Sequence, residues 1–147
     1  LQMKITIGRS DKADFPELAL SGIDVKIDSG AYTSSIHCTK IEEINTKGVP
    51  FLQFTLLDPE HPFYNHKEFI SKNYSSKKVK SSNGVAEMRF MIQTEIIIFN
   101  KKFPIHFTLS ERRDMKFPIL LGRKFLNKKF MIDTLKINLS HKLKTNK

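Results

Sequence analysis

Short runs in which apolar and polar residues alternate recur along most of the chain, and they constrain its fold more than any other feature. Residues 23–28 (IDVKID) alternate strictly, and the longer runs at 88–99 and 102–109 are rich in strand-forming residues. Such patterns are typical of β-strands with one buried face. Residues 100–101 predict a hairpin turn between the two longer runs. The one good helix signal is short and follows Gly122, so the sequence predicts an all-β protein, a small closed or partly open barrel with one short helix.

The second half of the chain contributes further strand signals. Residues 117–122, 129–133 and 135–139 each predict a short strand. Residues 58–84 contain several turn-forming Pro, Asn and Gly residues, and they predict loops with one or two short strands.

The composition is that of a folded protein with a core of its own. The chain has 147 residues, of which 39% are hydrophobic and 27% charged, and these values predict a single domain over residues 1–147. Cys38 is the single cysteine, which excludes an internal disulfide and any zinc site that needs two thiolates. No apolar run approaches the roughly 20 residues of a membrane helix, so we expect no membrane partner. The chain begins at Leu1, so the compartment stays open: the cytoplasm is favoured, and removal of an upstream leader is the alternative.

A formal net charge of +10 is the strongest bulk clue to function. Lysines concentrate in residues 71–83, in residues 122–129 and in a basic C-terminal tail, residues 136–147. Such a surplus attracts polyanions, either an acidic polypeptide or a nucleic acid, although it is also compatible with a merely solvated surface. Nucleic acid is the less favoured partner, because no aromatic-basic RNA-binding motif is present.

Several common catalytic and cofactor motifs are absent from the sequence. It contains no phosphate-binding P-loop, no dinucleotide-binding glycine motif and no His-Glu-x-x-His zinc motif. His37 and Cys38 are neighbours, but neighbours on a strand point to opposite faces and make a poor metal site. We therefore expect no metal and no cofactor.

Asp28 is the best candidate for chemistry. It ends an apolar strand and begins the sequence Asp28-Ser29-Gly30-Ala31, in which Gly30 permits a sharp turn and Ser29 offers a hydroxyl group. The same four residues also suit an ordinary turn, so this stretch alone leaves both interpretations open.

A second motif extends the pattern. Residues 117–126 (FPILLGRKFL) place apolar residues before Gly-Arg and a short helical segment. Together the two motifs resemble aspartic proteases of the single-lobe, retroviral type. Over about residues 8–135 the chain is similar to the bacterial family labelled "ATP-dependent zinc protease", whose domain is retropepsin-like. The other matching phrases are Gly8-Arg9, FPEL at 15–18, KSSNGVAEMR at 80–89, RRDM at 112–115 and FMID at 130–133.

The resemblance implies a barrel of the acid-protease type and a role for each motif. Asp28 would be the catalytic carboxylate. The phrase at residues 80–89 would contain a loop that faces the substrate, and Glu87 and Arg89 are expected to pair and support that loop. The residues that would support the active-site loop are Ser29, Gly30, Ala31, Thr33, Leu121, Gly122 and Arg123. The substrate-facing loop would consist of Lys80, Ser81, Ser82, Asn83 and Gly84.

An aspartic protease needs two carboxylates, and this sequence has one Asp-Ser-Gly. A homodimer could bring two copies of Asp28 together on its two-fold axis, which is the preferred hypothesis. Alternatively, Asp133 or Asp114 could serve within one chain. The resulting hypothesis is a peptidase that acts on acidic or glutamate-tailed polypeptides, and the alternative is a non-catalytic binding module of the same fold for an acidic partner.

Overall fold

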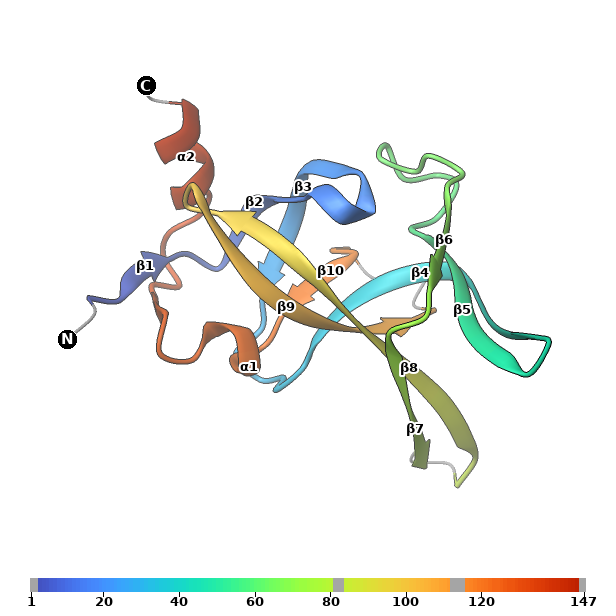
Figure 1. The fold of residues 1–147 in the computed structure, drawn as a ribbon. Coiled ribbons are helices and arrows are strands. Elements are labelled where there is room, and N and C mark those ends of the chain that lie inside the picture. Colours follow the sequence, from blue (N-terminus) through green and yellow to red (C-terminus); the bar gives the residue numbers. More distant parts are fainter. Residues whose placement is uncertain (1–2, 81–83, 112–115, 146–147) are drawn as a thin grey trace.

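The computed structural model describes residues 3–80, 84–111 and 116–145, and Figure 1 shows that they form mostly strands. A short 3-10 helix, η1 (Pro16–Leu18), and two helices, α1 (Arg123–Leu126) and α2 (Leu139–Thr145), accompany them. The strands are β1 (Ile5–Ile7), β2 (Ser10–Phe15), β3 (Leu20–Ile27), β4 (Ser34–Thr46), β5 (Val49–Leu56), β6 (Glu68–Ser71), β7 (Tyr74–Lys80), β8 (Ala86–Ile98), β9 (Lys101–Ser110), β10 (Ile119–Leu121) and β11 (Phe130–Ile132).

Six strands close into a barrel, which confirms the predicted fold class. The hydrogen-bonded order runs β10, β3, β2, β8, β9 and β4, and β4 pairs again with β10. Closure removes the free edges that an open sheet of this size would expose. Strands β1 and β11 form a separate two-stranded parallel sheet.

Strand β10 lies between two strands that are consecutive in the chain. It is parallel to β3, with Leu121 opposite Ile27, and antiparallel to β4, with Ile119 opposite Ile36. The loop that joins β3 to β4 must therefore cross the end of β10. This crossing positions residues 28–33, named the Asp28 loop below, at the end of the barrel wall.

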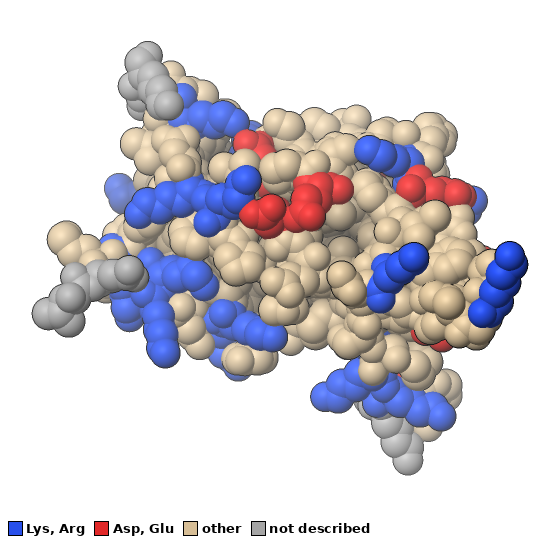
Figure 2. Space-filling model, viewed as in Figure 1, with Lys and Arg blue, Asp and Glu red and all other residues tan. Residues whose placement is uncertain are grey.

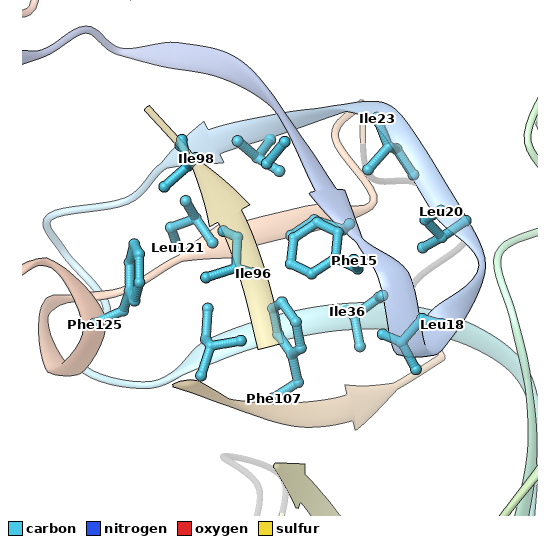
Figure 3. Close-up of a cluster of buried hydrophobic side chains, with 14 of the residues drawn as sticks. Phe15, Leu18, Leu20, Ile23, Ile36, Ile96, Ile98, Phe107, Leu121 and Phe125 are labelled. Carbon is cyan, nitrogen blue, oxygen red and sulfur yellow. The ribbon is translucent and has the colours of Figure 1, made fainter. Parts of the chain in front are cut away.

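The predicted alternation is visible in the core. Ile23 and Val25 of β3 are fully buried, whereas Asp24 between them is exposed. Phe15 and Phe107 pack with their ring centroids 5.4 Å apart at the centre of the cluster in Figure 3. Side chains from strands that are not hydrogen-bonded neighbours thus meet in the interior of the barrel, as expected for a small barrel.

Two hairpin arms extend beyond the barrel. One consists of β4 and β5, and the other of β7 and the first half of β8 (Figure 1). The hairpin between β8 and β9 is present as predicted, but its turn is formed by Phe99 and Asn100, one residue earlier than expected. Both turn residues have positive φ, as a tight hairpin turn of the primed type requires.

The strand predicted for residues 135–139 is wrong, because α2 begins at Leu139 in the segment that the sequence presents as a tail. The buried Asp11 carboxylate accepts hydrogen bonds from the backbone N–H groups of Ser140 at 2.8 Å and His141 at 3.1 Å. Asp11 thereby satisfies the free donors at the start of this helix. No helix in the described part of the chain is long and apolar enough to cross a membrane.

Candidate active site

The Asp28 loop begins directly after β3 and is tied to β10. The Asp28 backbone N–H donates to the Leu121 carbonyl at 2.9 Å, and the Asp28 carbonyl accepts from the Ala31 N–H at 3.3 Å. The Gly30 N–H donates to Asp28 Oδ1 at 3.0 Å. These bonds fix the direction of the Asp28 side chain, which is partly exposed.

Gly122 lies where the crossing is tightest. A Cβ atom at this position would lie 2.7 Å from the Tyr32 carbonyl oxygen and 2.8 Å from the Thr33 carbonyl carbon. The backbone φ of −95° is one that any residue adopts, so it is space and not conformation that requires glycine. The Gly122 N–H also donates to the buried Ser34 hydroxyl at 3.0 Å.

The first residues of helix α1 also hold the Asp28 loop in place through hydrogen bonds. The Arg123 N–H donates to the Ala31 carbonyl at 2.9 Å, and the Lys124 N–H donates to the Tyr32 carbonyl at 2.8 Å. The Arg123 guanidinium donates to the Ser29 carbonyl at 2.9 Å and lies 5.9 Å from the Tyr32 ring centroid. The structure thus brings the residues that the sequence assigns to loop support against the Asp28 loop.

A pocket of about 630 Å³ opens beside this loop. Its walls come from the Asp28 loop, from the ends of β4, β9 and β10, and from the β7–β8 hairpin. Asp28, Ala31 and Thr33 of the Asp28 loop thus share one pocket with residues of the β7–β8 hairpin, which lies some 50 positions later in the chain. The lining residues are Asp28, Ala31, Thr33, Ser35, Ser75, Ser76, Lys77, Arg89, Phe90, Met91, Thr108, Ser110 and Leu120.

Two cationic side chains, Lys77 and Arg89, line the same pocket, and no sequence motif marks them as a pair. Lys77 of β7 is directly opposite Arg89 of β8 in the hairpin register. Arg89 forms the expected ion pair with Glu87, at 3.2 Å between nitrogen and oxygen. The lysine-rich segment 71–83 predicted positive charge in this part of the chain. However, a two-residue turn at residues 83–84 would pair Arg89 with position 78, so the sequence alone does not identify Lys77.

The described part of the pocket contains a single carboxylate. Among the lining residues in the ranges 3–80, 84–111 and 116–145, only Asp28 is acidic. Asp133 lies after β11 and its side chain accepts a hydrogen bond from the Leu135 N–H at 3.0 Å; it does not line this pocket. Asp114 lies outside the described residues.

Two of the proposed substrate-facing residues, Lys80 and Gly84, lie in the part of the β7–β8 hairpin that the structure describes. Lys80 is the last residue of β7, and its backbone pairs with Ala86. Gly84 has a φ of +84°, which glycine adopts without strain. Ser81, Ser82 and Asn83 lie outside the described residues.

His37 and Cys38 have structural surroundings. Both are buried, and the His37 ring contacts the Ser110 carbonyl at 3.2 Å and the Asp58 carboxylate at 3.0 Å. Burial raises the pKa of the Cys38 thiol, which disfavours the reactive thiolate. Within the described ranges, no three His, Cys, Asp or Glu residues gather as metal ligands would.

Positive charge is unevenly distributed over the surface. In the view of Figure 2, lysine and arginine side chains gather around the β7–β8 hairpin at the bottom and around the terminal segments on the left. The β7–β8 hairpin, which contributes Lys77 and Arg89 to the pocket, is thus one of the positively charged parts of this face.

The closed barrel, the crossing of the Asp28 loop over β10 and the Gly122 contact define a single-lobe barrel of the retropepsin-like type. Comparison with known proteins agrees with this class. The family described as RimB-like, "retropepsin-like aspartic endopeptidase RimB", matches residues 6–142. The chain belongs to this family.

Relatives extend the comparison to longer proteins. The chain is 34% identical over 134 residues to a "Probable alpha-L-glutamate ligase" of Shewanella pealeana, and 33% identical over 134 residues to one of Desulfotalea psychrophila. Each match covers 88% of this chain and 28% of the relative, so the chain spans little more than a quarter of their length. The fold is also similar to the crystal structure of Lpg0085 from Legionella pneumophila, described as a protein of unknown function (DUF785). That match has a TM-score of 0.73 and 26% identity, and it covers 94% of this chain and 99% of the other.

Proposed function

We propose that this chain is an aspartic-type peptidase in which Asp28 activates water for attack on a peptide bond. The observation that carries the proposal is the position of Asp28 on a rigidly supported loop at the wall of a pocket of about 630 Å³. In such enzymes two neighbouring carboxylates share one proton, because like charges so close cannot both ionise. The ionised member takes a proton from water while the protonated member donates to the scissile carbonyl oxygen. The C–N bond then breaks as the amine nitrogen takes up a proton.

The second carboxylate is proposed to come from a second copy of the chain. Only Asp28 supplies an acid among the described residues that line the pocket. A two-fold axis at the pocket would bring two Asp28 side chains together without any further acid. Asp133 and Asp114 remain the candidates for a dyad within one chain.

Acidic polypeptides, including glutamate-tailed ones, are the proposed substrates. Lys77 and Arg89 line the pocket beside Asp28, and the chain has a net charge of +10. Both cations can donate charge-assisted hydrogen bonds to substrate carboxylates. The relatives' name, "Probable alpha-L-glutamate ligase", is consistent with a substrate that contains glutamate.

The activity is tested with a glutamate-tailed peptide and a neutral peptide of the same length. We expect cleavage of the acidic peptide by the wild-type protein and none by Asp28→Asn. Lys77→Gln and Arg89→Gln should raise the KM for the acidic peptide by roughly tenfold and leave the neutral peptide unaffected. Lys78→Gln is the matched control, because it removes one positive charge from the neighbouring position of β7, which does not line the pocket. Cleavage that persists in Asp28→Asn would refute the mechanism.

Mixing experiments separate the two sources of the second acid. If each site needs two copies of Asp28, an excess of Asp28→Asn protein should suppress the wild-type activity by forming mixed dimers. If the dyad lies within one chain, the activity per wild-type chain should stay constant, and Asp133→Asn or Asp114→Asn should abolish it.

A non-catalytic binding module for an acidic partner is the second candidate. The single described carboxylate in the pocket favours it, because a site of this kind needs cations and no acid pair. In that case glutamate-tailed peptides would bind without turnover, and their affinity would fall steeply with salt.

A further inference from the structure

A second pocket, of about 210 Å³, is lined by residues of α1, β4, β8 and β9 and by Lys129. The proposed peptidase reaction makes no use of it. Ser34 at the start of β4 and Gln93 of β8 contribute polar groups, and Lys124, Lys129 and His106 contribute nitrogen donors. None of the described residues that line this pocket is a carboxylate.

The surroundings of this pocket disfavour the protonated forms of His106 and Lys129. Burial, followed by the positive charge of Lys124, lowers the pKa of His106. Burial also lowers the pKa of the Lys129 ammonium group. A bound anion would offset both effects, because an opposite charge nearby favours the protonated form.

Lys129 is held in place before any ligand arrives. Its Nζ donates to the Phe125 carbonyl at 2.8 Å and lies 5.0 Å from the Phe125 ring centroid and 5.9 Å from that of Phe103. An ammonium group has three donors, so this contact leaves further donors for a ligand. A side chain fixed in this way loses little conformational entropy on binding.

We propose that this pocket binds a small oxyanion, a phosphate or a carboxylate group, through Lys124, Lys129 and His106. The volume accommodates several molecules of water at roughly 30 Å³ each, which is enough for an ion of this size. The site is linked to the Asp28 loop, since the Ser34 hydroxyl accepts from the Gly122 N–H at 3.0 Å and the Lys124 N–H donates to the Tyr32 carbonyl at 2.8 Å. Oxyanion binding would therefore stiffen the support of the Asp28 loop, whether or not Asp28 acts on peptides.

The test is an NMR titration of the 15N-labelled chain with inorganic phosphate and, separately, with free glutamate. Ionic strength is kept constant with chloride. We expect saturable shifts of the Ser34, His106 and Lys124 amide signals with at least one of the two anions. Saturation by phosphate alone assigns the site to phosphate groups, and saturation by glutamate assigns it to carboxylates.

Substitutions then locate the site. Lys124→Gln, at an exposed position that should not affect folding, is expected to weaken binding at least about fivefold, and Lys129→Gln should do the same. Lys128→Gln is the matched control, because this exposed neighbour does not line the pocket and should leave affinity unchanged. The absence of saturable shifts with both anions, or equal weakening by Lys128→Gln, would overturn the proposal.

Discussion

Replacing Gly122 by alanine tests whether close packing under the Asp28 loop holds this part of the barrel together. The new Cβ would meet three backbone atoms, the Tyr32 oxygen at 2.7 Å and the Thr33 carbonyl carbon and oxygen at 2.8 and 2.9 Å. Backbone atoms cannot rotate away as side chains do. To reach an ordinary contact of 3.4 Å, the two segments must separate by at least about 0.7 Å, the difference between 3.4 and 2.7 Å.

The expected cost has two parts. Overpacking at a rigid contact costs about 1–3 kcal/mol. The same separation strains the Arg123 N–H bond to Ala31 and the Lys124 N–H bond to Tyr32, each worth about 0.5–1.5 kcal/mol. Together these effects should lower the free energy of unfolding by roughly 2–6 kcal/mol, with about 4 kcal/mol as the central value.

Urea unfolding followed by circular dichroism measures this loss. Gly48→Ala is the matched control, because Gly48 has a φ of +81° and, among the described residues other than its chain neighbours, no atom lies within 4 Å of its would-be Cβ. Backbone strain alone should cost that variant about 1–2 kcal/mol. If Gly122→Ala loses no more stability than Gly48→Ala, the close approach of α1 to the Asp28 loop does not carry the energy assigned to it.

Three further predictions concern ionisable side chains. Asp11→Ala should lower the free energy of unfolding by about 2–4 kcal/mol, because it leaves N–H groups at the start of α2 without an acceptor. Amide hydrogen exchange should then become faster throughout α2. Unchanged exchange rates would contradict the capping role of Asp11. Burial opposes ionisation of Asp14, but the hydrogen bond from the Gly22 N–H and the contact with Lys144 outweigh it and lower the Asp14 pKa. Asp14→Asn should therefore be less stable than wild type by up to about 1 kcal/mol at pH 7, and urea unfolding should show this difference shrink as the pH falls below about 3.9. The hydrogen bond to Glu43 raises the pKa of Tyr74 to about 12, and ultraviolet difference titration against Tyr74→Phe should show this value, with Glu43→Gln returning it toward about 10.

Local sequence patterns predicted many of the secondary-structure elements. The alternation in residues 23–28 predicted a half-buried strand, and β3 has Ile23 and Val25 buried with Asp24 exposed. The helix after Gly122 and the hairpin between β8 and β9 were also visible, because both depend on residues close together in the chain. The strand predicted at residues 135–139 is absent, because the Asp11 carboxylate stabilises the start of a helix there. Asp11 lies about 130 residues away in the chain, so no local pattern could reveal this contact.

The sequence by itself determined that Asp28 follows a buried strand and begins a tight loop, since periodicity and turn chemistry act over a few residues. Only the tertiary structure decided what surrounds that carboxylate. The order of strands inserts β10 between β3 and β4 and presses Gly122 against the loop, and the register of β7 on β8 brings Lys77 and Arg89 into the pocket. A shift of register by one residue would turn those side chains to the opposite face. Their place beside Asp28 is therefore a property of the assembled barrel.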